Sequence, residues 1–385
     1  MSQPQASPEP DIKLESTPKP ELDIKSESKP KQSIKADATP LGRMPAEWAR
    51  HQATWISYPF DSGIWHAETW PDLLEHVRDE VARLIATISR YEPVVVNVRD
   101  KATEADARAK LSGLCDLSAV KFFRMPLDDS WFRDNGPIFI LRDNGTLALT
   151  DWQFNAWGRA FPQWQRDNDA PKLVARNLNL ERLSAPLVLE GGAIDVNGNG
   201  TLLTTTSCLL NDNRNLNHSQ TDIEAILARY LGIDKVVWLE GGLVDDDTDG
   251  HVDTIARFAN DHTLVCATAD EQSPHHETLA ANLDILQTFA DNHNLNLVTL
   301  PLPHTQRVIE GKLIPQSYAN FYIGNGFVVV PQYEDAHDED ALALLTPLFP
   351  GRKMIGLSAW HLVVGGGAFH CITQQQPLLT ALEAN

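Results

Sequence analysis

The sequence of 385 residues predicts an α/β fold, a five-bladed pseudosymmetric propeller of ββαβ-type units, and three observations lead to this prediction. From Met44 onward the chain passes five times from a helical pattern to a short apolar strand. Each of these strands leads toward a hairpin or half of one. Repeated units that cannot bury their apolar faces alone are expected to stack around a shared centre. A doubly wound sheet is the alternative, but it does not need so many hairpins.

Residues 1–42 precede the regular pattern and differ from it in composition. They are rich in Lys, Glu, Ser and Pro, and DIKLESTPKP at Asp11 recurs imperfectly as DIKSESKPK at Asp23. Because apolar residues are too sparse there to build a core, we expect a disordered tail. Residues 43–385 are then expected to form a single catalytic domain.

The helices and strands of the units can be placed in chain order. The clearest helix runs from Leu73 to Tyr91, with apolar residues three and four positions apart. Pro93–Val98 follows as a short β-branched strand of buried type. The equivalent strands of the later units are Pro186–Leu189, Val236–Leu239, Leu297–Leu302 and Lys353–Leu357.

Turn residues mark four hairpins, and a fifth hairpin is expected between the two ends of the domain. The four turns lie at Asp143–Gly145, Asn197–Gly200, Asn260–Asp261 and Asn325–Gly326. The segment that begins at Ala368 has no strand after it to pair with. We expect Ala53–Tyr58 to be its partner and to close the ring.

Composition restricts the classes of partner. With a formal charge of −20, the chain is expected to repel nucleic acid and to attract cations, although solubility alone also explains the acidity. The sequence has neither an apolar stretch of membrane-spanning length nor a signal-peptide pattern, so we expect no membrane partner. Four scattered cysteines do not make a disulfide framework, which fits a reducing cytoplasm. The oligomeric state stays open, with a homo-oligomer as one option.

Chemically capable residues cluster where each hairpin begins. In a ring of repeats these positions converge on the axis, which would gather five side chains in one pocket: Asp134, Glu190, His251, Asp253 and Cys371. Asn320 opens the remaining hairpin.

This set suits attack on a guanidinium group without a metal or a cofactor. Carboxylates match the forked donors of a guanidinium, and a strand would present His251 and Asp253 on one face. A thiolate from Cys371 could attack the central carbon while His251 transfers protons. Each part also has a structural interpretation. His251 and Asp253 could be a hydrogen-bonded pair, or form a metal site with His370 and Cys371, whereas Cys115, Cys208 and Cys266 are interpreted as buried filler.

Seven passages in order resemble the agmatine deiminases, in the group that includes the bacterial peptidylarginine deiminases. They are MPAEWARHQATWISYP at Met44, SWFRDNGP at Ser130, DWQFNAWGR at Asp151, LEGGAIDVNGNGTLLTTTSCLLN at Leu189, DDDTDGHVDTIARF at Asp245, QSYANFYIGNGFVVVPQ at Gln316 and GGGAFHCITQQQP at Gly365. The resemblance implies a five-fold α/β propeller and a hydrolase that converts agmatine to N-carbamoylputrescine and ammonia, as in putrescine and polyamine biosynthesis.

The resemblance also implies roles for single residues. Cys371 would be the nucleophile through a covalent thiouronium, and His251 would be the acid and base. Asp134 and Asp253 would grip the guanidinium beside Glu190. The expected substrate-binding residues are Trp131, Asp247, Asn320 and Arg159.

Three departures from the family pattern concern the far end of the substrate. Ala368 and Phe369 replace an amide and an aliphatic residue, Asp247 replaces a longer glutamate, and Arg159 replaces a glycine. Arg159 could bind a carboxylate, which would favour arginine or peptidyl-arginine as the substrate, or it could be an exposed loop residue. A catalytically silent binding module is a further alternative, and the complete residue set argues against it.

Overall fold

The computed structural model describes residues 39–66 and 69–379. Of the predicted tail, only residues 39–42 fall within this part of the chain, so its predicted disorder lies outside the described residues. Leu41 already contacts the folded domain, where its backbone N–H donates to the carbonyl of Arg229 at 2.7 Å. No helix within the described ranges is long and apolar enough to cross a membrane.

The predicted α/β class is confirmed, with five small sheets of similar pattern. The first has the strand order β18-β1-β2-β3, with β1 at His51–Ser57, β2 at Val94–Val98, β3 at Val120–Arg124 and β18 at Thr373–Pro377. The second consists of β4 (Ile138–Leu141), β5 (Leu147–Gln153) and β6 (Glu181–Val188). The third consists of β7 (Asp195–Val196), β8 (Thr201–Thr205) and β9 (Lys235–Leu239). The fourth consists of β10 (Ala256–Asn260), β11 (Thr263–Thr268) and β12 (Asn296–Pro301), and the fifth of β15 (Tyr322–Gly324), β16 (Phe327–Gln332) and β17 (Lys353–Ser358).

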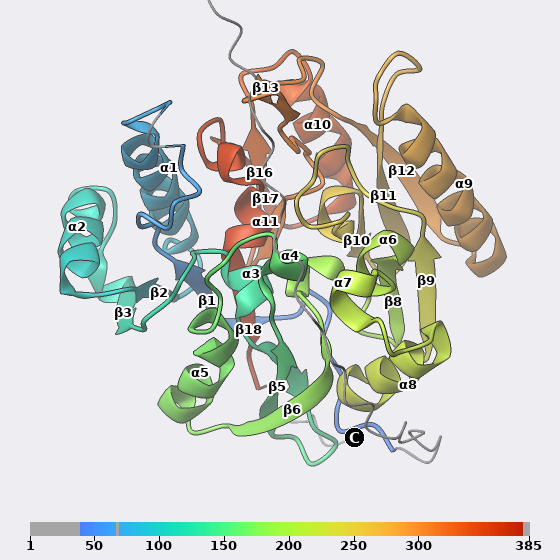
Figure 1. The fold of residues 1–385 in the computed structure, drawn as a ribbon, viewed down its shortest axis with the longest axis horizontal. Coiled ribbons are helices and arrows are strands. Elements are labelled where there is room, and N and C mark those ends of the chain that lie inside the picture. The colour runs from blue at the N-terminus through green and yellow to red at the C-terminus, as the bar shows by residue number, and fades with distance from the viewer. Residues whose placement is uncertain (1–38, 67–68, 380–385) are drawn as a thin grey trace, which may run out of the picture. The chain divides into compact units, whose positions relative to one another are not determined.

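Each sheet combines an antiparallel hairpin with a parallel strand. A parallel neighbour requires a crossover, and a helix supplies it in every sheet. The crossover helices are α1 (Leu73–Ile88), α5 (Ala170–Leu178), α8 (Gln220–Leu231), α9 (His276–His293) and α10 (Asp338–Leu345), and α2 (Lys101–Leu111) joins β2 to β3. Figure 1 shows α1, α2, α5, α8 and α9 at the periphery, and short helices such as α3 and α11 near the centre.

The predicted hairpins agree with the structure, including the one formed by the two ends of the domain. All four turn positions connect antiparallel strands. Strand β1 pairs with β18 in antiparallel register, with Trp55 opposite Gln374. The expected strand at 186–189 was placed too late, because β6 begins at Glu181, opposite Ala148 of β5. The first helix ends at Ile88 rather than at Tyr91.

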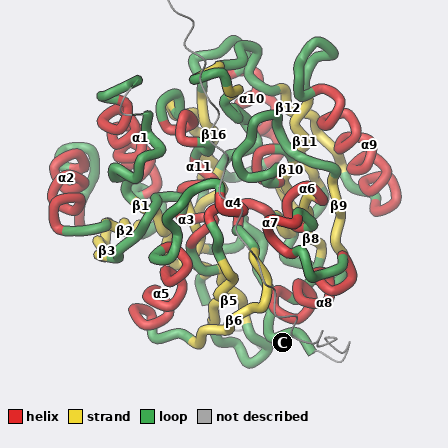
Figure 2. The backbone as a smooth tube through the Cα atoms, in the orientation of Figure 1, coloured by secondary structure: helices red, strands yellow, loops and turns green. Residues whose placement is uncertain are grey.

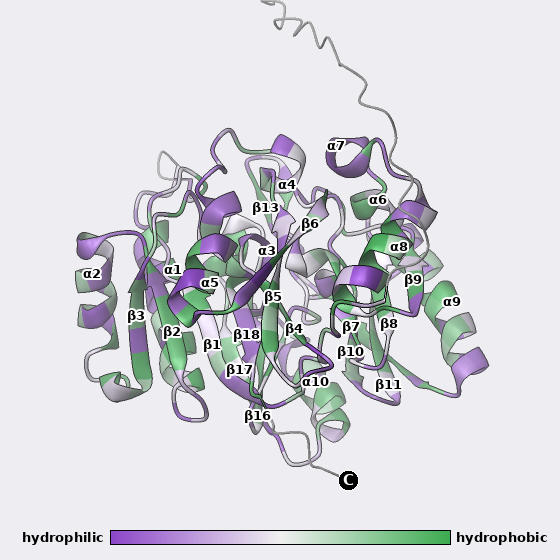
Figure 3. Ribbon diagram, turned by 90° about the horizontal axis from the view of Figure 1, so that it is seen from below, coloured by the Kyte–Doolittle hydropathy of each residue, from purple (hydrophilic) through white to green (hydrophobic). Residues whose placement is uncertain are grey.

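The strands lie inside the ring of crossover helices (Figure 2), and their buried apolar residues contribute to the hydrophobic clusters. All five residues of β2 are buried, as its four valines predict, and Asn97 is buried with them. Helix α1 contributes its apolar stripe to the same core as β2. In Figure 3 the hydrophobic colour gathers on strands such as β2, whereas α2 carries mostly hydrophilic residues.

Short helical turns come directly before four of the hairpins. They are α3 (Phe132–Asn135), η3 (Gly191–Ala193), η4 (Val252–Thr254) and α11 (Phe369–Ile372). Turn α3 contacts both α11 and η3, and η3 contacts η4. The repeated topology therefore brings these four turns together, and they carry the candidate chemistry.

Candidate active site

The five predicted catalytic side chains come from these turns. Asp134 lies in α3, Asp253 in η4 and Cys371 in α11, while Glu190 and His251 each come directly before a turn. All five are buried, with at most 6% of any of them exposed. The prediction that His251 and Asp253 lie on a strand was wrong, because β10 begins only at Ala256. Cys371 likewise lies in a helical turn before β18 rather than in a strand.

The side chains of three of these residues converge over Gly192. A methyl group added at Gly192 would lie 2.6 Å from Nδ1 of His251, 2.8 Å from Oδ1 of Asp134 and 3.0 Å from Oδ2 of Asp253. A larger residue at this position would therefore fill the space between them. The backbone N–H of Gly192 donates to Oδ1 of Asp134 at 2.9 Å. Gly192 thus both opens the pocket and fixes one of its carboxylates.

Cys371 is held by Asn320 and lies against Asp253. Its Sγ is 3.1 Å from Nδ2 of Asn320 and 3.5 Å from Oδ2 of Asp253. Oδ1 of Asn320 accepts backbone N–H bonds from Ala368, His370 and Cys371 itself. Asn320 was predicted to bind substrate, and the structure places it against the thiol and the turn that carries it.

Burial and neighbouring carboxylates disfavour the thiolate of Cys371. Together with Asp253 and Asp134, burial raises the pKa of the Cys371 thiol well above 9.0, although Asn320 opposes this. Burial also raises the pKa of Asp134 to about 6, against the effect of the His251 charge. Oδ2 of Asp134 accepts a hydrogen bond from Nε1 of Trp157 at 3.0 Å. The thiol therefore carries its proton in the free site.

His251 lies between two carboxylates. Nδ1 is 3.7 Å from Oδ1 of Asp134, and Nε2 is 4.0 Å from Oε2 of Glu190. Burial alone would lower the pKa of His251, but Asp134, Cys208 and Glu190 together raise it well above 6.5. The ring is therefore positioned and charged to give up a proton.

A buried arginine neutralises Glu190 on one side. Nε of Arg214 donates to Oε1 of Glu190 at 2.6 Å, and its Nη1 donates to Oδ2 of Asp249 at 2.7 Å. Because the side chains of Arg214 and Glu190 are both fully buried, this ion pair is screened little by solvent. Glu190 thus keeps a fixed position behind His251.

Four buried polar atoms of the site have no hydrogen-bond partner within the described part of the chain. They are Oε2 of Glu190, Nδ1 and Nε2 of His251, and Oδ1 of Asp253. An unpaired buried polar group costs free energy, and such groups are rare in folded proteins. Their concentration around one point indicates that a polar ligand completes the site.

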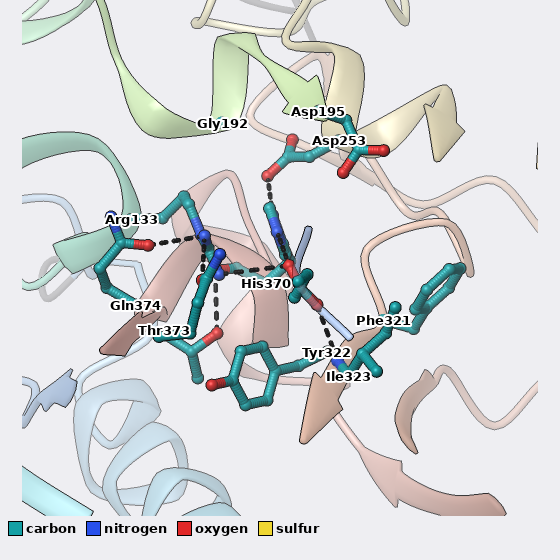
Figure 4. A network of polar contacts seen from close by, with 12 residues as sticks. Arg133, Gly192, Asp195, Asp253, Phe321, Tyr322, Ile323, His370, Thr373 and Gln374 are labelled. Atoms are coloured by element: carbon teal, nitrogen blue, oxygen red, sulfur yellow. Dashed lines mark hydrogen bonds and ion pairs between the residues drawn. The ribbon is translucent and has the colours of Figure 1, made fainter. Parts of the chain in front are cut away.

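The other oxygen of Asp253 belongs to a buried network that Figure 4 shows. His370 places Nδ1 2.7 Å from Oδ2 of Asp253 and Nε2 2.7 Å from Oε2 of Glu47. A carboxylate thus lies within hydrogen-bond distance of each ring nitrogen, and the ring bridges Asp253 and Glu47. Although burial favours the neutral acid, the hydrogen bond and charge of His370 hold the pKa of Asp253 below 3.8. Asp253 is thereby kept ionised with its free oxygen, Oδ1, unpaired.

Glu47 joins this network to three further elements. Its carboxylate accepts Nη2 of Arg257 at 2.9 Å and the backbone N–H of Ile323 at 2.7 Å, and it lies 3.6 Å from Nη2 of Arg133. Although burial opposes ionisation, Arg257 and His370 hold the pKa of Glu47 far below 4.5. A residue from the start of the domain therefore fixes turn α11 from behind.

The pocket in front of Cys371 is narrow, with a volume of about 30 Å³. Its walls come from the aromatic residues Trp131, Trp157 and Phe161, the acidic segment Asp246–Thr248, the glycines Gly365–Gly367, and the chemical residues Asp134 and Cys371. A Cβ at Gly367 would lie 2.9 Å from Sγ of Cys371, so this position requires glycine. Such a slender channel suits a linear, cationic ligand.

The predicted residues for the far end of a substrate lie at the outer part of the pocket. Oδ1 of Asp247 accepts a hydrogen bond from Nζ of Lys312 at 2.9 Å. Arg159 is exposed and lines an outer cleft together with Asp247 and Lys312, but not the narrow pocket. Asp247 is therefore closer than Arg159 to any ligand that reaches Cys371 through the pocket.

One group within residues 39–66 and 69–379 could hold a metal ion. The ligand atoms of Glu190, Cys208 and His251 all lie within 4.8 Å of one another, and all three residues are buried. Cys208 was interpreted as filler, and it lies beside the candidate general acid instead. The raised pKa of His251 favours its protonated ring, and a protonated ring does not bind a metal ion, so this geometry is compatible with metal-free chemistry.

Sequence reasoning missed several residues of the site. Trp157, Arg214 and Asp246 contribute a hydrogen bond, an ion pair and part of the wall. His370 and Glu47 hold Asp253 from behind. Some of these residues are charged or polar and lie inside a motif shared with the agmatine deiminases, such as Glu47 in MPAEW. Such a position in a motif does not show which residue the side chain contacts.

Comparisons with known proteins place this geometry among guanidine-modifying enzymes. The model of the Porphyromonas-type peptidyl-arginine deiminase family matches residues 43–377. An agmatine deiminase of Pseudomonas aeruginosa is 36% identical over 364 residues, covering 87% of this chain and 95% of that protein. A structure of the agmatine deiminase of Enterococcus faecalis superposes with a TM-score of 0.80 at 31% identity, covering 88% of this chain and 97% of that one. An agmatine deiminase from C. jejuni with substrate bound gives a TM-score of 0.77 at 30% identity, covering 87% and 96%.

Proposed function

The chain belongs to the Porphyromonas-type peptidyl-arginine deiminase family, and we propose that within it this protein is an agmatine deiminase. It hydrolyses the guanidinium group of agmatine, with water, to N-carbamoylputrescine and ammonia. The observation that carries this proposal is the set of four unpartnered buried polar atoms around Cys371. The two carboxylate oxygens among them offer acceptors to the donors of a planar cation, and the ring nitrogens of His251 can donate to the group that leaves.

The two aspartates suit a guanidinium on geometric grounds. Asp253 is ionised and presents a free Oδ1, and Asp134 lies across Gly192 from it. Carboxylates and guanidinium groups form paired, charge-assisted hydrogen bonds, which are stronger in a buried site. We therefore assign Asp134 and Asp253 to holding the guanidinium nitrogens against Sγ of Cys371.

The substrate cation activates the nucleophile. The thiol of Cys371 is protonated in the free enzyme because burial, Asp253 and Asp134 raise its pKa. A guanidinium bound to both aspartates removes the unfavourable charge next to Sγ and favours the thiolate. The thiolate then attacks the guanidinium carbon and gives a tetrahedral adduct.

His251 serves both halves of the reaction. Its raised pKa keeps the ring protonated, so it can donate a proton to the departing ammonia as the carbon–nitrogen bond breaks. A thiouronium on Cys371 remains. His251, now neutral, accepts a proton from water, which attacks the same carbon and releases the carbamoyl product and the thiol. Glu190, held by Arg214, orients the ring during both steps.

The charge of the outer pocket favours agmatine over arginine. Asp246 and Asp247 line the narrow channel, where an ammonium tail would lie. Arg159, the candidate contact for a carboxylate, lines only the outer cleft. A tail with a positive charge is therefore stabilised by the channel, and an α-carboxylate would meet two acids.

We also propose that the five sheets are the blades of a five-bladed propeller. Their shared pattern of a hairpin and a parallel strand supports this, as does the pairing of β1 with β18. Agmatine hydrolysis suits a cytoplasmic role in putrescine and polyamine synthesis, which we propose on the same basis.

Ammonia release from agmatine, free arginine and a short arginyl peptide tests this function. We expect kcat/KM for agmatine to exceed that for either arginine substrate by at least about a hundred-fold, because binding to wrongly charged tails is opposed inside the channel. Preference for free arginine or for the peptide would keep the chemistry and change the substrate. No ammonia from any of the three would refute the proposed activity.

A further inference from the structure

A second, much larger cavity adjoins the narrow pocket. It has a volume of about 600 Å³, against about 30 Å³ for the pocket in front of Cys371. Phe161, Asp247, Gly365 and Gly366 line both spaces. The two spaces therefore adjoin each other, and a ligand that ends with agmatine's primary amine leaves the outer space unused. We call the larger space the vestibule.

The lining of the vestibule combines apolar and acidic side chains. Ile64, Ile309, Ile314 and Val364 provide aliphatic surface. The charged side chains are those of Asp245, Asp247, Glu310 and Lys312, with His66 beside Glu310. Carboxylates thus outnumber the ammonium group. This combination matches a chain of methylenes that carries a further cation.

The vestibule is enclosed by a tied hairpin rather than by a loose loop. Strands β13 (Val308–Ile309) and β14 (Lys312–Leu313) form its outer wall. Lys312 pairs with Asp247, and the backbone N–H of Leu313 donates to Oδ2 of Asp245 at 2.9 Å. Across the opening, Oε1 of Glu310 accepts a hydrogen bond from the hydroxyl of Thr69 at 2.8 Å. These contacts join three separate segments around one space.

We propose that the enzyme also deiminates guanidinoalkylamines that extend beyond the primary amine of agmatine, with the extension bound in the vestibule. This rests on the proposed function, because the guanidinium end would use Cys371 and the two aspartates in the same way. One carbon–nitrogen bond of the guanidinium is hydrolysed, so the products are the matching carbamoyl polyamine and one ammonia. The extension takes no part in the bond changes.

The vestibule residues can accept such a chain without giving up their present contacts. A carboxylate has about four acceptor positions, so Asp247 and Glu310 can each bind an ammonium besides their current partners. Methylenes of the extension would be removed from water by the aliphatic wall, which is favourable. A peptide is the less suitable occupant, since it lacks the further cation and its C-terminal carboxylate would face the acidic lining.

The test uses agmatine that carries a 3-aminopropyl group on its primary amine, with agmatine and an arginyl peptide in parallel. Ile309→Trp fills the vestibule from β13. Val308→Trp is the matched control, because Val308 precedes Ile309 on the same strand, points to the opposite face and is 59% exposed. Glu310→Gln removes one acidic charge and keeps an acceptor for Thr69. Ammonia release gives kcat and KM for each substrate.

We expect the wild-type enzyme to turn over the extended substrate with a kcat/KM within about ten-fold of that for agmatine. Ile309→Trp should lower kcat/KM for the extended substrate about ten-fold, mainly by raising KM. The same variant should change kcat/KM for agmatine by less than about two-fold. Val308→Trp should leave kcat/KM for both substrates unchanged. Glu310→Gln should raise KM for the extended substrate only.

Three results would overturn the inference. The first is no turnover of the extended substrate by an enzyme that is active on agmatine. The second is an equal loss of kcat/KM for agmatine and for the extended substrate in Ile309→Trp. The third is turnover of the arginyl peptide by the wild type that Ile309→Trp abolishes, with no such effect on the extended substrate. Inactivity of the wild type on agmatine itself would refute the proposed function and is thereby distinguished from these outcomes.

Discussion

Replacement of Glu47 by glutamine tests whether the buried network is a support of the active site. The wild-type carboxylate accepts hydrogen bonds from His370, Arg257 and the backbone of Ile323 at 2.7 to 2.9 Å. Glutamine has nearly the same shape but only one acceptor oxygen, and its amide nitrogen would face a donor. The variant therefore leaves a buried donor unpaired and two buried cations with one anion fewer.

The size of the effect follows from burial. Removal of one partner of a buried ion pair costs about 3 to 5 kcal/mol of folding free energy, and Glu47 is only 5% exposed. The pKa of Glu47 in the folded protein lies below 4.5, so its contribution is complete above pH 4.5 and is lost as the pH falls below that value. The difference between wild type and variant should therefore narrow in acid, by up to about 1.4 kcal/mol for each pH unit below 4.5.

Urea unfolding of the full chain at about pH 7 measures the loss of folding free energy in Glu47→Gln. The same measurement at about pH 4 shows whether the difference between wild type and variant narrows in acid. Glu104→Gln is a matched control, because Glu104 also bridges two arginines, Arg108 and Arg124, but does so at the surface of α2. The control should lose less than about 1 kcal/mol. A Glu47→Gln variant that is as stable as this control at neutral pH would refute the reasoning. Agmatine KM should also rise in Glu47→Gln, since His370 would hold Asp253 less firmly.

Further predictions concern the chemistry and the tail. Cys371→Ser should lower kcat by several orders of magnitude while agmatine still binds in calorimetry, and a serine variant with near-normal turnover would exclude the covalent route. Asp134→Asn should make the Cys371 thiol react faster with iodoacetamide at mildly alkaline pH, because loss of a nearby negative charge lowers the thiol pKa, although agmatine turnover falls about a hundred-fold. Slower alkylation in that variant would contradict the assigned electrostatics. Activity should survive EDTA, and a loss reversed by zinc would point to the Glu190, Cys208 and His251 group. Removal of residues 1–38 should leave kcat and KM unchanged, as steady-state kinetics would show.

The hairpins and their connections could be predicted because their signals are local. Asn-Gly between alternating strands specifies a turn whatever the rest of the chain does, and Asn325-Gly326 joins β15 to β16 as expected. The pairing of the first and last strands also followed, since one unpaired strand remained at each end. The bounds of β6 could not be predicted, because its first residues, such as Glu181 and Arg182, are polar and become a strand only by pairing with β5.

The candidate catalytic set could be predicted in identity but not in local structure. Repetition before each hairpin selected His251 and Asp253, yet the alternation rule gave them a strand where the chain makes a helical turn. The supporting residues could not be found in this way. Glu47 meets His370 across 323 positions, and Arg214 meets Glu190 across 24. Neither pair has a spacing that any regular element would specify.

The distribution of charge explains how a protonated thiol and three carboxylates can share one site. Arg214 binds Glu190 and His370 binds Asp253 on the side away from the pocket, and the charged ring of His251 lies between Asp134 and Glu190. On the pocket side, Oδ1 of Asp253 is left without a partner, and Asp134 meets only neutral donors and His251 at 3.7 Å. The missing positive charge is therefore left to the substrate.

Substrate binding and nucleophile activation are then one event, since the guanidinium that satisfies the aspartates also removes the obstacle to the thiolate. The same logic favours release of the product. A carbamoyl group is neutral, so hydrolysis removes the charge that held the reacting end between Asp134 and Asp253 and returns Cys371 to its protonated state. Only the tail of the product keeps its ammonium, close to Asp247, where Lys312 is already present as a competitor for the same carboxylate.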